Sequence, residues 1–205
     1  MMSMQSHWEH IYGTKAPDRV SWFRPHLETS LALIERVASD RAAHIIDVGG
    51  GEATLVDDLV RAGYIRLTVL DISRTAVDFT KVRLGNLAAG VEWIVGDVTK
   101  TDFQANAYDV WHDRAVFHFL TSASQRAGYI ERVARAVKPG GHVIIGTFGP
   151  EGPRKCSGLD VQRYDAESLH GEFGARFRLI DSLKELHQTP FGTTQQFLYC
   201  LCVVE

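Results

Sequence analysis

Residues 44–55 read His44-Ile45-Ile46-Asp47-Val48-Gly49-Gly50-Gly51-Glu52-Ala53-Thr54-Leu55. The segment begins as a short apolar run, which is typical of a strand buried on both faces. Three glycines follow, and because glycine has no Cβ the chain can turn sharply there and bring its backbone close to a ligand. The first N–H groups of the helical pattern that comes next point toward the same place. Strand, glycine turn and helix together predict the first unit of a nucleotide-binding α/β sheet.

The glycines alone do not identify a nucleotide, because Gly49 and Gly51 fill only the first two places of the G-x-G-x-x-G pattern. Residues 67–73 predict a second strand containing Asp71, about 20 residues past the loop, where an acid reaches the two ribose hydroxyls. Residues 91–97 predict a third strand that ends in Asp97. Either acid by itself could be an ordinary strand-end or helix-cap residue. Two acids at successive strand ends favour a nucleotide site.

The rest of the chain alternates between helical and strand patterns. Helices are expected over residues 26–39, 53–62, 74–87, 122–137 and 165–173, and further strands over the start of 108–120 and over 142–148, 177–187 and 194–204. The alternation predicts a parallel sheet with helices on both faces, and the short link at 188–193 predicts an antiparallel hairpin at the end. We therefore expect one doubly wound, mostly parallel α/β domain over residues 1–205. Residues 149–164 are rich in Gly and Pro and are expected to form a loop over the substrate.

Residues 1–25 precede the sheet and carry four large aromatic side chains, namely Trp8, Tyr12, Trp22 and Phe23. Aromatic rings serve both cores and binding surfaces. The segment is therefore either an arm packed on the core or a lid over a ligand.

Bulk composition argues against several classes of protein. The net charge is −3 with no basic stripe, so nucleic acid is a poor partner. No apolar run is long enough to span a bilayer, and no charged-then-apolar leader is visible. Three cysteines do not form a disulfide framework, which favours a cytoplasmic protein.

Four motifs resemble, in order and spacing, those of class I S-adenosylmethionine-dependent methyltransferases: Asp47-Val48-Gly49-Gly50-Gly51, Leu70-Asp71-Ile72-Ser73, Gly96-Asp97-Val98 and Val137-Lys138-Pro139-Gly140-Gly141. The resemblance runs from about Trp8 to the end and implies the Rossmann-like, seven-stranded methyltransferase fold. Ala53 departs from it, because a third glycine is common at that place; small residues are tolerated there.

Two groups within this class compete. The chain is similar to thiopurine and thiol/halide methyltransferases in Trp8 with Tyr12, in Asp113-Arg114 after the fourth strand, and in the Gly/Pro-rich loop. It also resembles lysine methyltransferases of elongation factors, in residues 12–23 and in Gly63-Tyr64. Neither similarity fixes the methyl acceptor.

The resemblance implies S-adenosyl-L-methionine as cofactor and a role for each matching residue. Cofactor-binding residues are expected to be Trp8, Tyr12, Trp22, Asp47, Gly49, Gly50, Gly51, Asp71, Ile72, Asp97, Val98 and, through its backbone, His112. Asp113 and Arg114 are expected to face the acceptor or to hold the geometry of the site, with a plain structural ion pair as the simpler reading. Arg114 could orient an anionic substrate through its planar donor fork.

Other functions remain to be weighed. A zinc site at His112, Asp113 and His118 is not expected, because their spacing matches no compact site. Cys156 could be a nucleophile or a metalloid ligand, but a small loop residue is the simpler reading. A nicotinamide-dependent reductase would share the loop and Asp71, and an inactive interaction module would share the whole fold. We expect a methyltransferase acting on a small molecule, as a monomer or homodimer, with a protein lysine methyltransferase as the alternative.

Overall fold

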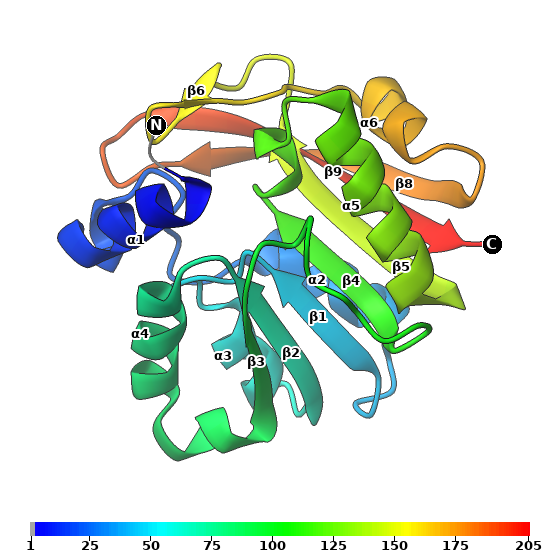
Figure 1. Cartoon of the computed structure of the whole chain (residues 1–205), viewed down its shortest axis with the longest axis horizontal. Helices are drawn as coiled ribbons and strands as arrows, with labels where there is room; N and C mark the ends of the chain where they lie inside the picture. The colour runs from blue at the N-terminus through cyan, green and yellow to red at the C-terminus, as the bar shows by residue number, and fades with distance from the viewer. Residues whose placement is uncertain (1–2) are drawn as a thin grey trace.

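The computed structural model describes residues 3–205 and is built on one seven-stranded sheet (Figure 1). The strand order is β3-β2-β1-β4-β5-β9-β8. The first five pair in parallel, whereas β9 is antiparallel to both β5 and β8. The strands are β1 (His44–Val48), β2 (Arg66–Asp71), β3 (Val91–Val95), β4 (Tyr108–Arg114), β5 (Val137–Phe148), β8 (Phe177–Gln188) and β9 (Thr194–Val204). The predicted doubly wound sheet with an antiparallel terminal hairpin is confirmed.

Helices cover both faces of the sheet because successive strand residues point to opposite sides. Ile45 of β1 packs in one apolar cluster with residues of α2 (Glu28–Val37) and α3 (Leu55–Arg61). Ile46 packs in the other, with residues of α5 (Ala123–Ala136) and α6 (Ala166–Phe173). Both isoleucines are fully buried, so β1 holds the two layers together.

Two segments differ from the pattern-based expectation. Helix α4 (Arg74–Leu84) ends three residues early, because Gly85 adopts a positive φ of 58° and a 3-10 turn (Gly85–Gly90) follows. Strand β5 begins at Val137 and contains the Lys138-Pro139-Gly140-Gly141 run that was expected to precede it. Val137 pairs with Tyr108 before a register shift, so the turn residues are absorbed as a bulge.

The remaining segments lie at the carboxyl ends of the parallel strands. The 149–164 loop contains a short hairpin of β6 (Lys155–Cys156) and β7 (Leu159–Asp160). Helix α1 (Met4–Thr14) and the 3-10 turn Pro17–Arg19 precede the sheet, and α1 contacts α4 (Figure 1). None of the helices in residues 3–205 is long and apolar enough to cross a membrane.

Candidate active site

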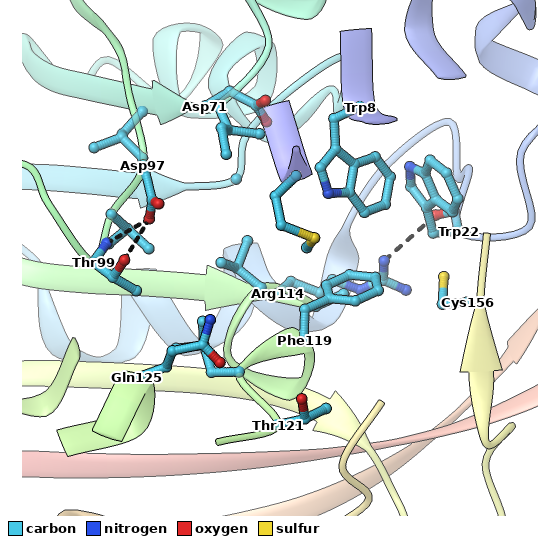
Figure 2. A pocket seen from close by; sticks show the side chains of 18 of the residues that line it. Trp8, Trp22, Asp71, Asp97, Thr99, Arg114, Phe119, Thr121, Gln125 and Cys156 are labelled. Carbon is cyan, nitrogen blue, oxygen red and sulfur yellow. Dashed lines mark hydrogen bonds between the residues drawn. The ribbon is translucent and has the colours of Figure 1, made fainter. Parts of the chain in front are cut away.

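A cavity of about 260 Å³ opens where β1, β2 and β4 end, the edge at which parallel sheets bind ligands. Nine of the predicted residues line it: Trp8, Tyr12, Trp22, Gly49, Asp71, Ile72, Asp97, Val98 and Arg114. Figure 2 shows Asp71 and Asp97 at one end and Trp22, Arg114 and Cys156 at the other. The cavity therefore has an acidic end and an end with a cation among rings.

A smaller cavity of about 40 Å³ shares Tyr12, Trp22, Gly49 and Arg114 with the larger one. Three further predicted residues, Asp47, Gly50 and His112, line this smaller cavity. Gly51 and Asp113 line neither. Arg114 is thus part of the wall of both cavities.

The glycine loop needs two of its glycines for distinct reasons. Gly49 has a φ of +71°, and a Cβ there would lie 2.0 Å from Cγ2 of Val116. Gly51 has a φ of +46°, and a Cβ there would lie 2.8 Å from the Tyr12 hydroxyl oxygen. Side chains are disfavoured at such φ values. The loop therefore has no side chain at Gly49, where Val116 packs against it, nor at Gly51, where Tyr12 of the arm packs against it.

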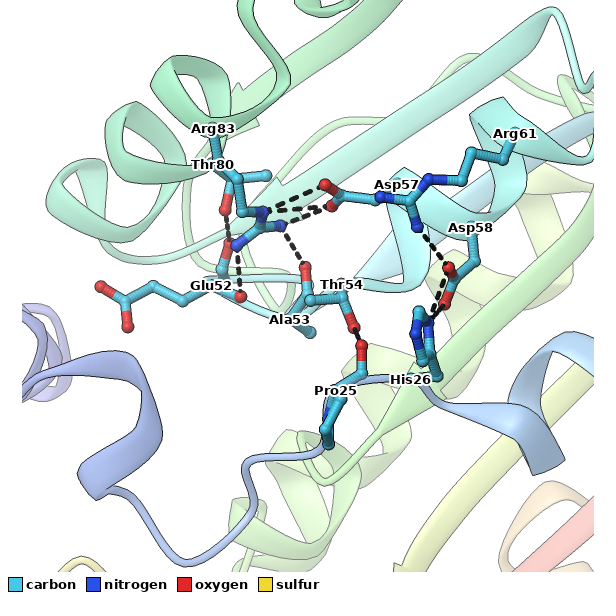
Figure 3. Close-up of polar contacts among 11 residues, drawn as sticks. Pro25, His26, Glu52, Ala53, Thr54, Asp57, Asp58, Arg61, Thr80 and Arg83 are labelled. Atoms are coloured by element: carbon cyan, nitrogen blue, oxygen red, sulfur yellow. Dashed lines mark hydrogen bonds and ion pairs between the residues drawn. The ribbon is translucent and has the colours of Figure 1, made fainter.

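Helix α4 holds the glycine loop from outside the cavity (Figure 3). Arg83 donates to the backbone oxygens of Glu52 and Ala53, both at 2.7 Å, and pairs with Asp57. Thr80 donates to the Gly51 oxygen at 2.7 Å. Sequence reasoning missed these anchors, because two polar residues on a mixed helical pattern carry no local sign of a partner some 30 residues away.

Asp71 is buried at the acidic end and accepts a hydrogen bond from the Ser73 N–H at 2.8 Å. Burial raises the pKa of its carboxyl to about 7, with the nearby Asp47 charge adding to the effect. Burial likewise raises the pKa of Glu52 to about 7, against the attraction of Arg83. Oε2 of Glu52 is buried without a hydrogen-bond partner. These two carboxyl groups have too few hydrogen-bond donors and positive charges around them to offset their burial. Such a shortage is expected where a ligand supplies the missing donors.

Asp97 sits in a more polar setting. Its Oδ1 accepts from the N–H and the hydroxyl of Thr99, at 2.9 and 2.7 Å, and Lys100 lies 3.1 Å from Oδ2. Burial pushes the pKa of Asp97 upward, but these contacts outweigh it and the net shift is downward. Asp97 is therefore a fixed carboxylate acceptor that faces the cavity.

The N-terminal arm both packs on the fold and lines the cavity. Met4, Trp8 and Tyr12 are spaced one helical turn apart on α1, so one face of the helix meets the cavity. The Trp8 ring lies 5.7 Å from Trp22 and 5.2 Å from Phe119, centroid to centroid. The two readings of the arm are thus compatible.

Glu9 joins this arm to α4. Its carboxylate accepts from the Arg74 N–H at 2.7 Å, the Thr75 N–H at 3.2 Å and the Ser73 hydroxyl at 3.0 Å. The free N–H groups at a helix N-terminus bind anions well. Glu9 therefore fixes α1 beside the end of β2, where Asp71 lies.

Asp113 does not face the acceptor. Its side chain is fully buried and accepts from the Val116 N–H at 2.8 Å, the Phe117 N–H at 3.1 Å and the Tyr129 hydroxyl at 2.6 Å. Burial raises its pKa to about 6 despite these donors. Asp113 shapes the turn after β4 and makes no ion pair with Arg114, so of the two expectations the structural one fits its position.

Arg114 reaches the cavity with two of its three guanidinium nitrogens hydrogen-bonded. Nε donates to the Tyr199 hydroxyl at 2.9 Å, Nη1 donates to the Trp22 oxygen at 3.4 Å, and the guanidinium lies 4.1 Å from the Phe197 ring centroid. Nη2 has no hydrogen-bond partner, although Glu185 lies 3.6 Å away, and the side chain is only 6% exposed. Nη2 therefore has an ion-pair partner in Glu185 but no hydrogen bond.

Cys156 and His118 are chemically quiet. Burial raises the pKa of the Cys156 thiol to about 11, so the thiol stays protonated at neutral pH. Burial, with the Arg114 charge, lowers the pKa of His118 to about 3, so that ring is neutral. Within residues 3–205 no group of three or more His, Cys, Asp or Glu residues is placed to hold a metal ion.

Comparison with known proteins agrees with this geometry. Residues 45–141 match the family model described as a methyltransferase domain. The match spans β1 to the bulge in β5 and so includes the glycine loop, Asp71, Asp97 and Arg114.

Solved structures extend the similarity to the whole chain. One, from a study of the conversion of a disulfide bond into a thioacetal group during echinomycin biosynthesis, has a TM-score of 0.79 at 15% identity and covers 99% of this chain and 92% of that one. Another, an S-adenosylmethionine-dependent methyltransferase from Anabaena variabilis, has a TM-score of 0.74 at 14% identity, covering 100% and 96%. The fold is that of the class I methyltransferases, and the comparisons support S-adenosylmethionine as the cofactor.

The curated relatives are longer proteins, and this chain matches only part of each of them. The eEF1A lysine and N-terminal methyltransferase of Danio rerio is 22% identical over 152 residues, which is 73% of this chain and 22% of that protein. The chain spans less than two thirds of the length of each of the three curated relatives that it matches.

Proposed function

We propose that the protein transfers a methyl group from S-adenosylmethionine to a small, soft nucleophile. The observation that carries this proposal is the division of the cavity between an acidic end beside the glycine loop and an end where Arg114 lies among aromatic rings. The first end matches the cofactor and the second is free for an acceptor.

The residues at the acidic end fit the cofactor. Asp71 is buried and short of donors, which the two ribose hydroxyls supply. Ile72 and Val98 give apolar walls for the adenine, and Asp97 offers a carboxylate to its amino group. Gly49 leaves room for the side chain of Val116, which lines the same cavity. The methionine part extends into the smaller cavity beside Asp47 and His112.

The acceptor end supplies orientation and exclusion of water. When bound, S-adenosylmethionine supplies an electrophilic methyl group. Trp8, Trp22 and Phe119 enclose the space beside it, which holds the nucleophile in line and keeps water out. Positioning of this kind lowers a barrier by about 7–11 kcal/mol. A thiolate or a similar soft anion needs no general base.

The charge of Arg114 favours a small anion over a protein lysine. A guanidinium that is 6% exposed and whose Nη2 makes no hydrogen bond attracts an anionic acceptor and repels an ammonium group, although Glu185, 3.6 Å from Nη2, offsets part of its charge. The similarity to a protein studied for sulfur chemistry in echinomycin biosynthesis agrees with a soft acceptor. Lysine methylation remains the second candidate, because of the 22% identity to the Danio rerio enzyme.

A radiolabelled methyl-donor assay tests the proposal. The full chain is incubated with tritiated S-adenosylmethionine and with 4-mercaptobenzoate, benzeneselenol or arsenite, beside whole-cell lysate. We expect label in the small-molecule fraction, and loss of label on 4-mercaptobenzoate in Arg114→Ala. Arg36→Ala is the matched control, since that arginine pairs with Asp181 on the surface. Label on a discrete protein band with none on small molecules would favour the lysine reading.

Calorimetry with S-adenosylhomocysteine and with NADH separates the other classes. Binding of NADH alone would support a reductase. Binding of S-adenosylhomocysteine without turnover of any acceptor would support an inactive module.

A further inference from the structure

We propose that His187 is a positioning residue, which fixes the Trp22 ring at the acceptor end by holding the peptide group that precedes Trp22. His187 lies on β8, and its Nε2 is 2.7 Å from the backbone oxygen of Ser21. Trp22 lines both cavities, and its ring lies 5.7 Å from the Trp8 ring, centroid to centroid. His187 itself lines neither cavity. It therefore acts through Trp22, and its importance for methyl transfer rests on the proposed function.

Trp22 lies in a turn that holds itself only weakly. One N–H···O bond of 3.3 Å closes the turn of residues 20–23, which is longer than a usual backbone hydrogen bond. Side chains from two strands hold the peptide groups on either side of Trp22. His187 binds the Ser21 oxygen at 2.7 Å, and Arg114 Nη1 donates to the Trp22 oxygen at 3.4 Å (Figure 2). Because the His187 bond is much the shorter, it contributes most to fixing the direction of the Trp22 backbone.

The surroundings of His187 explain why a histidine stands there. A carbonyl oxygen only accepts, so Nε2 carries the proton that is donated to Ser21. Burial, with the Arg114 charge adding to it, lowers the pKa of His187, which agrees with a neutral ring. The side chain is fully buried, and Nδ1 has no hydrogen-bond partner within residues 3–205. An unpaired buried nitrogen costs free energy that an apolar side chain would avoid, so the bond to Ser21 is the contact that accounts for the residue.

Strand β8 holds the arm at a second point. Glu185 and His187 are two residues apart on this strand, so their side chains lie on the same face of the sheet. The Glu185 carboxylate accepts from Arg24 Nη1 at 3.2 Å. The Arg24 side chain is 28% exposed, and a partly exposed ion pair contributes little. β8 thus fastens the arm on both sides of Trp22, and the buried bond from His187 is the stronger of the two contacts.

The first measurement uses the wild-type protein without ligand. The full chain is labelled with 15N-histidine, and a long-range 15N–1H NMR spectrum shows which ring nitrogen of His187 carries the proton. His187→Gln assigns the signal. We expect an Nε2–H that exchanges slowly with water at neutral pH, because the Ser21 oxygen accepts from it in a buried place. A ring protonated only on Nδ1 could not donate to Ser21 and would overturn the proposal.

The second measurement follows the Trp22 ring itself. The full chain is labelled with 5-fluorotryptophan, and the 19F signal of Trp22 is assigned with Trp22→Phe. In His187→Leu the Ser21 oxygen loses its donor, so we expect the Trp22 signal to shift or broaden. In His187→Gln the side-chain amide can donate to the same oxygen, and the signal should return to its wild-type position. The signal of Trp111, which lies in the other apolar cluster, should stay in place in both variants.

The matched control is His170→Leu. It removes a similar bond, of 2.6 Å from His170 Nε2 to the Phe177 oxygen, at a place away from both cavities. An unchanged Trp22 signal in His187→Leu, or an equal change in His170→Leu, would overturn the proposal. A shift of the Trp111 signal as large as that of Trp22 would also overturn it, because it would indicate a general packing defect.

The third measurement is the affinity for 4-mercaptobenzoate in the presence of saturating S-adenosylhomocysteine. His187→Leu should weaken it by about fivefold, the factor that corresponds to one ordinary hydrogen bond, and His187→Gln should restore most of the loss. If the wild type does not bind S-adenosylhomocysteine, the proposed function fails, whereas the Trp22 signal of the ligand-free protein still decides the positioning role. If the wild type binds both ligands and His187→Leu weakens 4-mercaptobenzoate no more than His170→Leu does, the positioning role fails while the function stands.

Discussion

The two ends of the cavity are built in different ways. At the acidic end, Gly49, Asp71 and Asp97 each follow or end one of the neighbouring strands β1, β2 and β3, within fifty residues of chain. At the other end, Trp22, Arg114, Cys156 and Phe197 come from four segments spread over most of the sequence. The first end depends on backbone conformation and local order. The second depends on side chains that tertiary packing brings together.

The largest effect is expected from a substitution at the acidic end of the cavity. Gly49→Ala places a methyl group 2.0 Å from Val116 at a φ of +71°. Affinity for S-adenosylhomocysteine should fall by more than about 100-fold, because backbone strain and the displacement of Val116, which lines the cavity, combine. Titration calorimetry measures this. Gly13→Ala is the control, since nothing lies within 4 Å of its added Cβ; equal binding by the two variants would refute the importance of the contact between Gly49 and Val116.

A smaller effect comes from Asp71. Asp71→Ala should weaken S-adenosylhomocysteine binding by about 1–3 kcal/mol, the cost of losing a partner in a buried hydrogen bond. In the wild type, ribose donors favour the ionised carboxylate, so affinity should rise as pH increases toward the pKa of about 7 and then level off. Asp71→Asn should bind with little pH dependence. Glu52→Gln is measured in parallel, because its pKa is also raised to about 7.

The same pKa makes a prediction for stability. A carboxyl whose pKa is about 4 when unfolded and about 7 when folded favours the folded state at low pH, and that contribution is lost between the two values. Asp71→Asn should therefore raise Tm relative to the wild type more at pH 8 than at pH 5. Thermal unfolding followed by circular dichroism at both pH values tests the sign.

A modest effect is expected from a change in the N-terminal arm, whose aromatic side chains line the cavity. Glu9→Gln weakens three contacts to the start of α4, and a helix-terminal carboxylate is worth about 0.3–1 kcal/mol. Limited proteolysis of residues 1–25 should be faster in Glu9→Gln, and S-adenosylhomocysteine should slow it in both proteins. Cleavage at one rate with and without ligand would mean that the arm is not a lid.

The smallest expected effect is at Cys156. Its thiol is protonated at neutral pH because burial raises its pKa to about 11. Cys156→Ala should leave methyl transfer within about twofold, and iodoacetamide should react slowly at pH 8. Loss of all activity in the variant would restore the nucleophile or metalloid-ligand reading.

The difference between the two ends also explains what the sequence could predict. The strand order and the cavity positions of Gly49, Asp71 and Asp97 follow from periodicity and glycine placement, which are local. Asp113 shows the limit: its neighbour Arg114 lines the cavity, whereas Asp113 turns inward, because alternation along β4 sends the two side chains to opposite faces. The alternation was missed because Asp113 and Arg114 were expected to follow the fourth strand, whereas β4 extends to Arg114.

Hydrogen-bond partners that lie far apart in the sequence could not be predicted, for a related reason. Arg114 and Tyr199 are 85 residues apart, and Glu9 and Arg74 are 65 apart. Nothing in a single sequence marks a tyrosine in an apolar strand, or a glutamate on a short helix, as the partner of a distant group. Those contacts exist only once β9 and α1 have packed.

The position of β9 has a consequence for the order in which the two ends of the cavity can form during synthesis. β1, β2 and β3 leave the ribosome well before residues 194–204, and their contacts are with near neighbours in sequence. Until β9 is added between β5 and β8, the Arg114 guanidinium has neither the Tyr199 hydroxyl nor the Phe197 ring. If the proposed function holds, a nascent chain folded only through β5 lacks the contacts that hold Arg114 at the acceptor end, and we expect methyl transfer to require the last strand.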